Sequence, residues 1–451
     1  MVGLRVTGEA LVGHFTALGH AVTAADDRPD SETFAAHAAR ARALGATVLE
    51  RPDVDTLRRT VAGAVLVVPS PGIPPHHRAL EAARELAVPI RSEIDIAAEV
   101  ARDAGRPVIA AVTGTNGKTS VTTLATAILE ESGIRAGAAG NVGRALIEAV
   151  SDPDLDVVVA EVSSFQLEYT DVFQPRVAVL LNVADDHLDW HGSAAAYAAA
   201  KARVFSRQEA GDLAIVNADD DGWDPATRPG HAAAIAFSTA ADAPAGSYRV
   251  VDGALVDPHD AVIARCDELI DPLPHDLANA LAATAVAVGL GGTLAAARAT
   301  LRGFSRLPHR VALVGEAMGV RYYDDSKATN PHATLHALGS FPHAVLIAGG
   351  VNKGLDLGAL RAGADHIRAV VAIGAAAPEI EAAFSGLPVP VVTADSMTAA
   401  VTTAADLADR GDVVLLSPAC ASFDWYRDYA ERGDDFARVV GELVGDRGAL
   451  G

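Results

Sequence analysis

The sequence is poor in cysteine and contains no long apolar run. Its 451 residues include only two cysteines, Cys266 and Cys420, which lie far apart in the chain. This excludes a disulfide scaffold and a cysteine metal motif, and it favours a reducing compartment, so we expect a cytoplasmic protein. No apolar run reaches the roughly 18 residues of a membrane helix, and no signal-peptide pattern is present, so neither a membrane span nor secretion is expected.

Positive charge is also scarce. Lys+Arg amounts to 36 and Asp+Glu to 58, which gives a net charge of −22. General binding of nucleic acid needs a broad basic surface, so this class of partner is excluded, and an anionic ligand must be bound by a local cluster of cations. Because 50% of the residues are hydrophobic and 21% are charged, the chain can fill several cores and is not a disordered protein.

Lysine is the rarest of the basic residues, since only Lys118, Lys201, Lys327 and Lys353 are present. Arginine replaces lysine readily on a solvated surface, but not where a compact ammonium or a free amine is required. We therefore regard each of the four as a candidate functional residue. The alternative is that they are ordinary surface lysines that remain by chance.

Short apolar runs alternate with Ala-rich helical stretches along the whole chain, which predicts an α/β fold with parallel sheets. The length indicates about three domains. We expect them over residues 1–104, 105–307 and 308–451. Predicted strands cover residues 22–25, 65–68, 108–112, 156–162, 177–183, 213–217, 320–323, 344–347, 370–373 and 413–416.

The most specific pattern follows the strand predicted at 108–112. It reads Thr113-Gly114-Thr115-Asn116-Gly117-Lys118-Thr119-Ser120 and precedes an amphipathic helix. Backbone amides of such a glycine loop bind phosphate together with the helix N-terminus, while the lysine reaches the β- and γ-phosphates and the threonine hydroxyl ligates Mg²⁺. Val112 stands where the usual P-loop has its first glycine, so this is a shorter variant. A glycine-rich turn without a ligand is the alternative.

Two more strand ends carry polar residues. Glu161 ends the strand predicted at 156–162, and a carboxylate at that place beside a phosphate loop is suited to ligate Mg²⁺. His187 follows the strand predicted at 177–183. From the residues alone it is either a loop histidine bonded to backbone or a ligand of metal or phosphate.

The remaining lysines lie in strand-end loops or on a helix near them, where α/β proteins bind ligands. Lys201 is part of a helical run that also contains Arg203, so this helix accepts arginine and position 201 requires an amine. Lys327 belongs to Asp-Asp-Ser-Lys-Ala-Thr-Asn at residues 324–330. Lys353 belongs to the glycine loop at residues 349–354.

Four strings together resemble the Mur ligase family. They are the phosphate loop, EVSSFQLE at 161–168, DDSKATN at 324–330 and SPACASFD at 417–424. The similarity extends over the whole chain. The last three strings are similar to the branch of the family that adds D-glutamate.

The resemblance implies a Rossmann-like N-terminal domain for a UDP moiety, a central P-loop ATPase-like domain with a parallel sheet, and a Rossmann-like C-terminal domain for the amino acid. It implies an ATP-dependent ligase of peptidoglycan precursor synthesis, which joins UDP-N-acetylmuramoyl-L-alanine to D-glutamate through an acyl phosphate. The implied cofactors are ATP and two Mg²⁺ ions, without a redox cofactor, and we expect a monomer.

The resemblance also implies roles for individual residues. Lys201 is expected to be carbamylated, because a carbamate is an anionic Mg²⁺ ligand that arginine cannot provide. The catalytic residues are Lys118, His187, Lys201 and Lys327. The metal ligands are Thr119, Glu161, His187 and Lys201. The ATP contacts are Gly114, Thr115, Asn116, Gly117, Lys118, Thr119, Ser120, Asn279, Arg310 and Asp325. The substrate contacts are Thr7, Asp26, Ser70, Asn141, Ser163, Gln166, Thr329, Lys353, Ser422 and Tyr429.

The sequence departs from the family pattern at its N-terminus and before Asn279. Arg5 occupies the place of the second glycine in the loop Gly3 to Gly8, so no NAD role is expected. Little chain precedes that loop, so either the true start of the chain lies further upstream or the domain has a trimmed edge. Asp276 stands where the family usually has asparagine, and a carboxylate can accept from the adenine amine but cannot donate to the ring.

Four rival interpretations remain. Two share the chemistry, namely a folylpolyglutamate-synthase-like ligase and a Mur ligase for another amino acid, and the C-terminal strings disfavour both. A regulator that has lost catalysis would be expected to lack Lys118, Glu161, His187 or Lys201, all of which are present. A dinucleotide-dependent dehydrogenase needs an intact glycine loop, which Arg5 interrupts.

Overall fold

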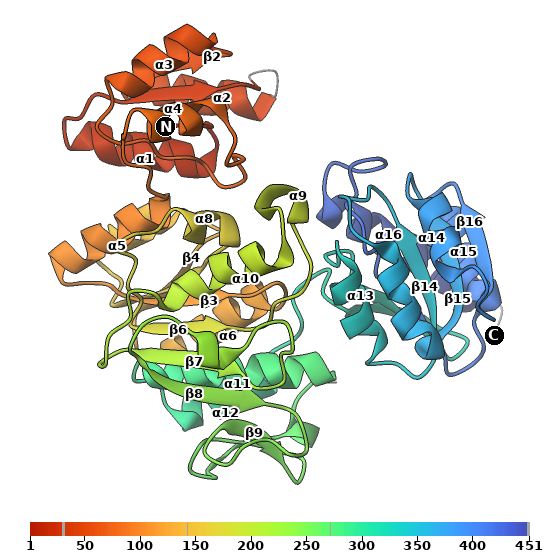
Figure 1. Cartoon of the computed structure of the whole chain (residues 1–451). Coiled ribbons are helices and arrows are strands. Elements are labelled where there is room, and N and C mark those ends of the chain that lie inside the picture. The colour runs from red at the N-terminus through yellow and green to blue at the C-terminus, as the bar shows by residue number, and fades with distance from the viewer. Residues whose placement is uncertain (29–31, 142, 271, 449–451) are drawn as a thin grey trace. The chain divides into compact units, whose positions relative to one another are not determined.

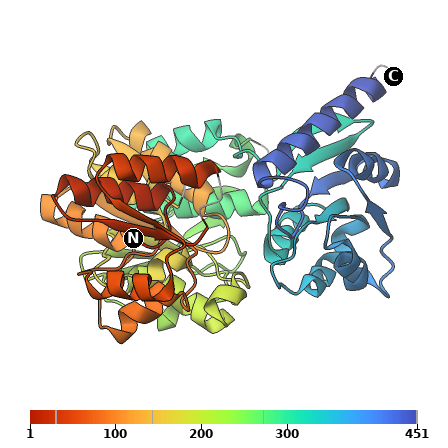
Figure 2. The ribbon, with the colours of Figure 1, turned by 90° about the horizontal axis from the view of Figure 1, so that it is seen from above.

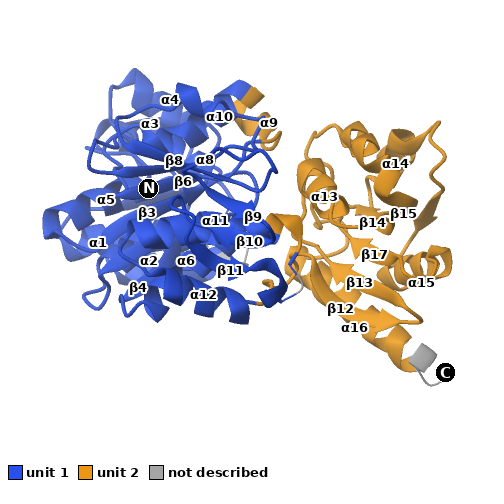
Figure 3. Cartoon of the chain, turned by 90° about the horizontal axis from the view of Figure 1, so that it is seen from below, with its two compact units in different colours: residues 1–183, 195–272, 276–304 blue, residues 184–194, 273–275, 305–451 orange. Residues whose placement is uncertain are grey.

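The computed structural model describes residues 1–28, 32–141, 143–270 and 272–448 and is α/β throughout, as predicted (Figure 1). The chain forms two compact units (Figure 3). Unit 1 comprises Met1–Val183, Ala195–Pro272 and Asp276–Phe304, and unit 2 comprises Ala184–Ala194, Leu273–His275 and Ser305–Gly451. The domain borders expected near residues 104 and 307 stay a prediction.

The N-terminal part of unit 1 contains a small parallel sheet. Strands β1 (Thr23–Asp26) and β2 (Thr47–Glu50) pair in parallel. Val2 forms single parallel bridges with Ala25 and with Pro69, so it lies between these two segments. The strand predicted at 65–68 is present only as isolated bridges. The helices here are α1 (Val6–Ala17), α2 (Glu32–Ala43), α3 (Val54–Ala62) and α4 (Arg78–Glu85).

A nine-stranded sheet in the order β11-β10-β9-β8-β7-β6-β3-β5-β4 forms the rest of unit 1. The strands from β4 to β9 are parallel, whereas β10 and β11 are antiparallel additions. The strands are β3 (Val108–Thr113), β4 (Ala136–Gly140), β5 (Val157–Glu161), β6 (Val177–Leu180), β7 (Leu213–Asn217), β8 (Ala233–Ser238), β9 (Tyr248–Val251), β10 (Ala254–Val256) and β11 (Val262–Arg265).

Helices cover both faces of this sheet (Figure 1). One face packs against α5 (Glu93–Ala104), α7 (Leu146–Val150), α8 (Ser164–Glu168) and α10 (Ala194–Ala202). The other packs against α6 (Lys118–Glu131), α11 (Pro274–Gly289) and α12 (Leu294–Gly303). The central strands β3 and β5 are apolar up to their last residues, Thr113 and Glu161, and such nearly continuous apolar runs are typical of parallel strands that are buried on both faces.

Unit 2 is built on a six-stranded sheet in the order β12-β13-β17-β14-β15-β16, in which only β12 is antiparallel to its neighbour. The strands are β12 (Ala312–Ala317), β13 (Val320–Asp324), β14 (Ala344–Gly349), β15 (Ile367–Ile373), β16 (Val391–Ala394) and β17 (Val413–Leu416). The helices are α9 (Leu188–His191), α13 (Pro331–Leu338), α14 (Ala377–Phe384), α15 (Met397–Leu407) and α16 (Tyr429–Gly448). The last helix, α16, packs across β12 and β13 (Figure 2).

Each large sheet brings together strand ends that are distant in the sequence. In unit 1, β3 lies between β5 and β6, and in unit 2, β17 lies between β13 and β14. Because the carboxyl ends of parallel strands meet at one edge, the loops that follow them form a common ligand-binding edge. Within the described part of the chain no helix is both long and apolar enough to cross a membrane.

Candidate active site

The predicted phosphate loop joins β3 to α6 in unit 1, as its sequence indicated. Gly117 has a φ of +83°, and a Cβ there would lie 2.6 Å from Oδ1 of Asn279. Gly114 is similarly crowded, because a Cβ would lie 2.9 Å from Cβ of Leu181. Both positions therefore require glycine, and the loop stays open for an anion at the N-terminus of a 14-residue helix.

Two of the four lysines converge on this loop. The Lys118 ammonium donates to the carbonyl oxygens of Gly114 and Thr115, each at 2.9 Å. The Lys201 ammonium donates to the same Gly114 oxygen at 2.7 Å. Lys201 is only 2% exposed, so it is no solvated helix lysine. A buried ammonium is costly unless it is paired, and here the carbonyl of Gly114 accepts from it.

Two residues that the sequence argument did not assign to the site hold the loop in shape. Asn182, just after β6, accepts from the amide of Asn116 at 2.8 Å and donates back to its carbonyl at 3.2 Å. The hydroxyl of Tyr197 lies 3.2 Å from that of Thr115, and its ring lies 4.4 Å from the Lys201 ammonium. Tyr197 stands four residues before Lys201 on one helix, which is the only sequence signal that could have indicated it.

Glu161 ends β5, next to the phosphate-loop strand. Its Oε1 accepts from the Asn141 side chain at 2.9 Å, so the structure brings together two residues predicted for different ligands. Glu161 is 2% exposed, and among the described residues its buried Oε2 has no hydrogen-bond partner. A buried carboxylate oxygen without a donor is a suitable ligand for a cation such as Mg²⁺.

The two residues that are expected to bind the second Mg²⁺ ion belong to different units. His187 belongs to unit 2, where its backbone amide donates to Asp186, whereas Lys201 belongs to unit 1. The described residues include no group of three His, Cys, Asp or Glu side chains that could hold a metal. His187 has a φ of +52°, which is uncommon for a residue with a side chain. Its pairing with Lys201 stays a prediction.

Asn279, a predicted ATP contact, lies in the second turn of α11, and Asp276 lies in the first. Asn279 touches the phosphate loop, as the space around Gly117 shows, and Asp276 is one turn earlier on the same helix. Asp276, where the sequence departs from the family pattern, is therefore one helical turn from a residue that touches the phosphate loop.

Three residues predicted to bind the UDP sugar surround the first loop of the chain. Asp26 accepts from the amide of Leu4 at 2.8 Å, and Ser70 donates to the carbonyl of Gly3 at 2.8 Å. Thr7 lies in the first turn of α1. This loop at a helix N-terminus can receive a phosphate group.

Ser163 and Gln166, also predicted to contact substrate, bond to each other. They form the capping box of α8, in which Gln166 accepts from the amide and hydroxyl of Ser163, both at 2.9 Å. Gln166 is buried. Their positions are thus fixed without a ligand.

In unit 2 the loops after β13, β14 and β17 carry the residues predicted for D-glutamate and for phosphoryl transfer. The Lys327 ammonium lies 3.6 Å from the ring centre of Tyr429, which brings these two together. Thr329 follows on the β13 loop, Lys353 lies on the β14 loop, and the buried Ser422 lies on the β17 loop. These strands are neighbours, so all three loops leave the same edge of the sheet.

Asp325, predicted to bind ribose, is buried. It accepts from the hydroxyl of Ser417 at 2.7 Å. Burial raises the pKa of Asp325 to about 7, although the Ser417 hydrogen bond and the charge of Arg310 favour its ionised form. The positive charge of Arg310, another predicted nucleotide contact, therefore stabilises the ionised form of the Asp325 carboxyl group.

Arg432 of α16 is a buried residue of this edge that sequence reasoning missed. It donates to the hydroxyl and carbonyl of Ser326 at 2.9 and 2.8 Å and to the carbonyl of Cys420 at 3.1 Å. It therefore joins the loops after β13 and β17. Burial lowers the pKa of Arg432 to about 10. In the sequence it looked like any arginine on the polar face of a helix, so no signal indicated it.

Two family models match the chain. The Mur ligase middle domain covers residues 112–287, and the Mur ligase, glutamate ligase domain covers residues 309–420.

Similar proteins extend this match over nearly the whole chain. A protein named UDP-N-acetylmuramoylalanine–D-glutamate ligase from Frankia casuarinae is 43% identical over 450 residues, which cover 98% of this chain and 93% of that protein. One of the same name from Streptomyces coelicolor is 38% identical over 466 residues, which cover 98% and 97%.

Solved structures share the fold. UDP-N-acetylmuramate–alanine ligase from Thermotoga maritima superposes with a TM-score of 0.59 at 18% identity and 98% coverage of both chains. The MurF ligase of the same organism in complex with ADP gives 0.60 at 19% identity, covering 85% of this chain and 95% of that one. Because full-length relatives are 38–43% identical, the protein belongs to the Mur ligase family, among the UDP-N-acetylmuramoylalanine–D-glutamate ligases.

Proposed function

We propose that this chain ligates D-glutamate to UDP-N-acetylmuramoyl-L-alanine and hydrolyses ATP to ADP and phosphate in doing so. As a Mur ligase it is an ATP-dependent ligase of peptidoglycan precursor synthesis. The structural observation that carries the proposal is the convergence of Lys118 and Lys201 on the carbonyl of Gly114. The Lys118 ammonium favours a polyphosphate at that place, and the Lys201 amine lies where, once carbamylated, it could hold a Mg²⁺ ion beside the polyphosphate.

The reaction has two steps. A carboxylate oxygen of the UDP substrate attacks the γ-phosphorus, and ADP leaves. The amine of D-glutamate then attacks the acyl carbon, loses a proton, and phosphate leaves. Such phosphoryl transfer depends on positioning and on neutralisation of charge. Lys118 and the phosphate-loop amides would neutralise the phosphates, and Lys327 would stabilise the transferring phosphoryl group or the oxyanion.

The residues present fit a Mg²⁺ site, because Glu161 keeps a buried oxygen without a donor and Thr119 lies in the first turn of α6. These two would hold one ion, and His187 with a carbamylated Lys201 would hold a second. When bound, the ions supply positive charge to the phosphates. That charge lowers the repulsion between the substrate carboxylate and ATP.

The three parts of the chain divide the ligands. Residues 1–104 would bind the UDP moiety through Thr7, Asp26 and Ser70, and Asn141 would contact the sugar. Residues 105–307 would bind ATP. Residues 308–451 would grip D-glutamate, with the ammonium of Lys353 and the hydroxyls of Thr329 and Ser422 on its carboxylates. The shared edge of β13, β14 and β17 supports this last assignment.

The free state of both cysteines supports a reducing, cytoplasmic location, and we propose a monomer.

The test is release of ADP with UDP-N-acetylmuramoyl-L-alanine, with D-glutamate present or omitted. We expect release that requires both substrates, and a product heavier by one glutamate residue. A preference for another amino acid would favour the related ligases, and folate-type substrates test the folylpolyglutamate-synthase-like alternative. A Lys118→Ala variant controls for contaminating ATPases, because it should lose the release.

A further inference from the structure

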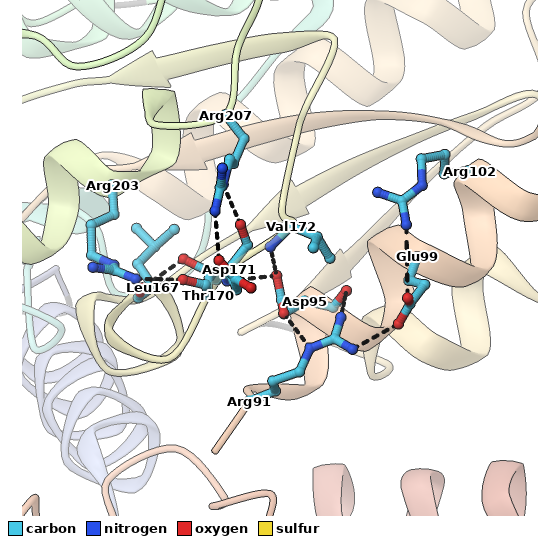
Figure 4. A network of polar contacts seen from close by, with 10 residues as sticks. All are labelled: Arg91, Asp95, Glu99, Arg102, Leu167, Thr170, Asp171, Val172, Arg203 and Arg207. Atoms are coloured by element: carbon cyan, nitrogen blue, oxygen red, sulfur yellow. Dashed lines mark hydrogen bonds and ion pairs between the residues drawn. The ribbon is translucent and has the colours of Figure 1, made fainter. Parts of the chain in front are cut away.

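The chain between Glu161 and β6 forms a short segment that begins with α8 and continues through residues 169–172. It is only partly regular, because α8 has five residues and ends at Glu168. The carbonyl of Leu167, near the end of α8, already accepts from the amide and the hydroxyl of Thr170. Arg203 adds further donors from outside the segment. Its Nε donates to the carbonyl of Leu167 at 2.8 Å, and its Nη2 donates to the carbonyl of Thr170 (Figure 4).

Arg203 directly follows the helix that carries Lys201. Helix α10 ends at Ala202, and a 3₁₀ turn runs from Arg203 to Phe205. The guanidinium therefore fixes the end of α10 to the end of α8. Lys201, in the last turn of α10, is held at the same junction while its ammonium reaches Gly114.

The far side of the segment is fixed by α5. Asp95 is fully buried, and its Oδ1 accepts from the amides of Asp171 and Val172 at 3.0 and 2.7 Å (Figure 4). Its Oδ2 accepts from Nε of Arg91 at 2.5 Å. The segment that Arg203 contacts is thus well fixed, because hydrogen bonds hold it from α5 on one side and from the end of α10 on the other.

Arg207 offers an internal comparison. It donates to the carbonyl and carboxylate of Asp171, in the same segment, yet its side chain is 57% exposed and lies four residues further from Lys201. Exposed ion pairs contribute little. If arginine at 203 were only a tolerated surface residue, both arginines would be equally dispensable.

We propose that Arg203 is a positioning residue, which keeps Lys201 at the phosphate loop by fixing the end of its helix to the carbonyls of Leu167 and Thr170. Lysine is a poor replacement, because Arg203 reaches the two carbonyls with two different nitrogens of one rigid plane, Nε and Nη2, whereas the donors of lysine all lie on one nitrogen at the end of a flexible stem. This inference rests on the proposed function, in which Lys201 serves Mg²⁺ and ATP. It predicts an effect on nucleotide and metal use that leaves amino-acid use unchanged.

The experiment compares Arg203→Ala, Arg203→Lys and Arg207→Ala in the full chain. Steady-state rates give kcat and the KM values for ATP and D-glutamate, and half-saturation by Mg²⁺ is measured at fixed ATP. Loss of a residue that orients a ligand costs roughly 10- to 100-fold. We expect both Arg203 variants to lose that much in kcat/KM for ATP and to need more Mg²⁺. The KM for D-glutamate and the parameters of Arg207→Ala should stay near those of the parent. Added guanidinium ion at non-denaturing concentration should partly restore Arg203→Ala.

Equal behaviour of the Arg203 and Arg207 variants would overturn the inference, as would a uniform loss of kcat with unchanged KM values and Mg²⁺ requirement. If Arg203→Ala does not fold, Arg203→Lys alone decides. Calorimetric binding of a non-hydrolysable Mg·ATP analogue separates the two proposals. A parent that binds the analogue but ligates nothing defeats the proposed function, while weaker binding by the Arg203 variants would still support positioning.

Discussion

The ammonium of Lys201 and the ammonium of Lys118 share one acceptor, the carbonyl oxygen of Gly114. Lys201 reaches it from 87 residues further along the chain. Two like charges so close together repel, and an anion at the loop relieves that repulsion. Without a ligand the Gly114 carbonyl therefore binds the two ammonium groups only weakly, and a phosphate oxygen can take its place as their acceptor.

A Lys201→Arg exchange should remove most ligase activity. Arginine keeps the charge and the helix propensity but cannot be carbamylated. Steady-state assays should show the loss, and mass spectrometry of the parent with Mg·ATP should show an added carboxylate on Lys201. Near-normal activity of the variant, or a free amine under those conditions, would show that no carbamate acts here.

A Gly117→Ala exchange should weaken ATP binding. The new methyl group would lie 2.6 Å from Oδ1 of Asn279, and alanine at a φ of +83° costs about 1–2 kcal/mol of backbone strain. Gly133→Ala is the matched control, since Gly133 has a φ of +79° and nothing within 4 Å of the added atom. Both variants should lose thermal stability, but only the first should raise the KM for ATP. A similar KM change in both would refute a steric role.

The enzyme should strongly prefer D-glutamate to D-glutamine. In the proposed site Lys353 would offer its ammonium to a carboxylate of D-glutamate, and a lost charge-assisted hydrogen bond costs about 1.5–3 kcal/mol, or roughly 10- to 150-fold in kcat/KM. Lys353→Met should remove most of this preference, because it should lower kcat/KM for D-glutamate. Competition assays with both amino acids measure it, and equal rates for the two in the parent would contradict the assignment.

Glu93 should make stability depend on pH. It is 2% exposed, and burial raises the pKa of its carboxyl to about 7 despite a hydrogen bond from the amide of Ile147. Between pH 4.5 and 7 the folded state therefore holds a proton that the unfolded state has released, so stability falls as pH rises through this range and levels off above it. The loss is on the order of 3 kcal/mol.

The check is thermal unfolding at several pH values. Glu93→Gln can keep the Ile147 hydrogen bond without a charge, so its stability relative to the parent should increase from pH 5 to pH 8. Glu99→Gln, on the same helix but partly exposed and paired with Arg91, should show no such trend. A constant difference between Glu93→Gln and the parent would refute a titrating Glu93.

Much of the site could be predicted because its residues are contiguous in strand-end loops. The phosphate loop and the DDSKATN and SPACASFD strings lie where alternating apolar runs placed them, after β3, β13 and β17. Strands at 213–217 and 413–416 were predicted with their observed ends. Buried parallel strands are nearly continuous apolar runs, and that signal is local.

What was missed depends on contacts across the fold. Tyr197 meets Thr115 across 82 residues, and Arg432 meets Ser326 across 106 residues, so no local pattern indicates them. The strands that were not predicted are β2, β4, β8, β9, β10, β11, β12 and β16. Of these, β9 and β11 have four residues of mixed polarity and β10 has only three residues, so their local signal is weak. The chain's low lysine content did indicate Lys201, but Arg203, judged a tolerated arginine, has partners of its own.

Unit 2 is assembled from three separate stretches of chain, and this constrains how the protein can be taken apart. A fragment that starts at residue 305 would lack the stretch Ala184–Ala194. It would lose Asp186, whose carboxylate accepts from the buried side chain of Asn330 at 3.2 Å. Asn330 also caps α13 and ends the DDSKATN loop. A fragment cut at the apparent domain border should therefore include residues 184–194 together with the C-terminal part, so that the loop stays intact. A chimera of two relatives should take both stretches from the same relative.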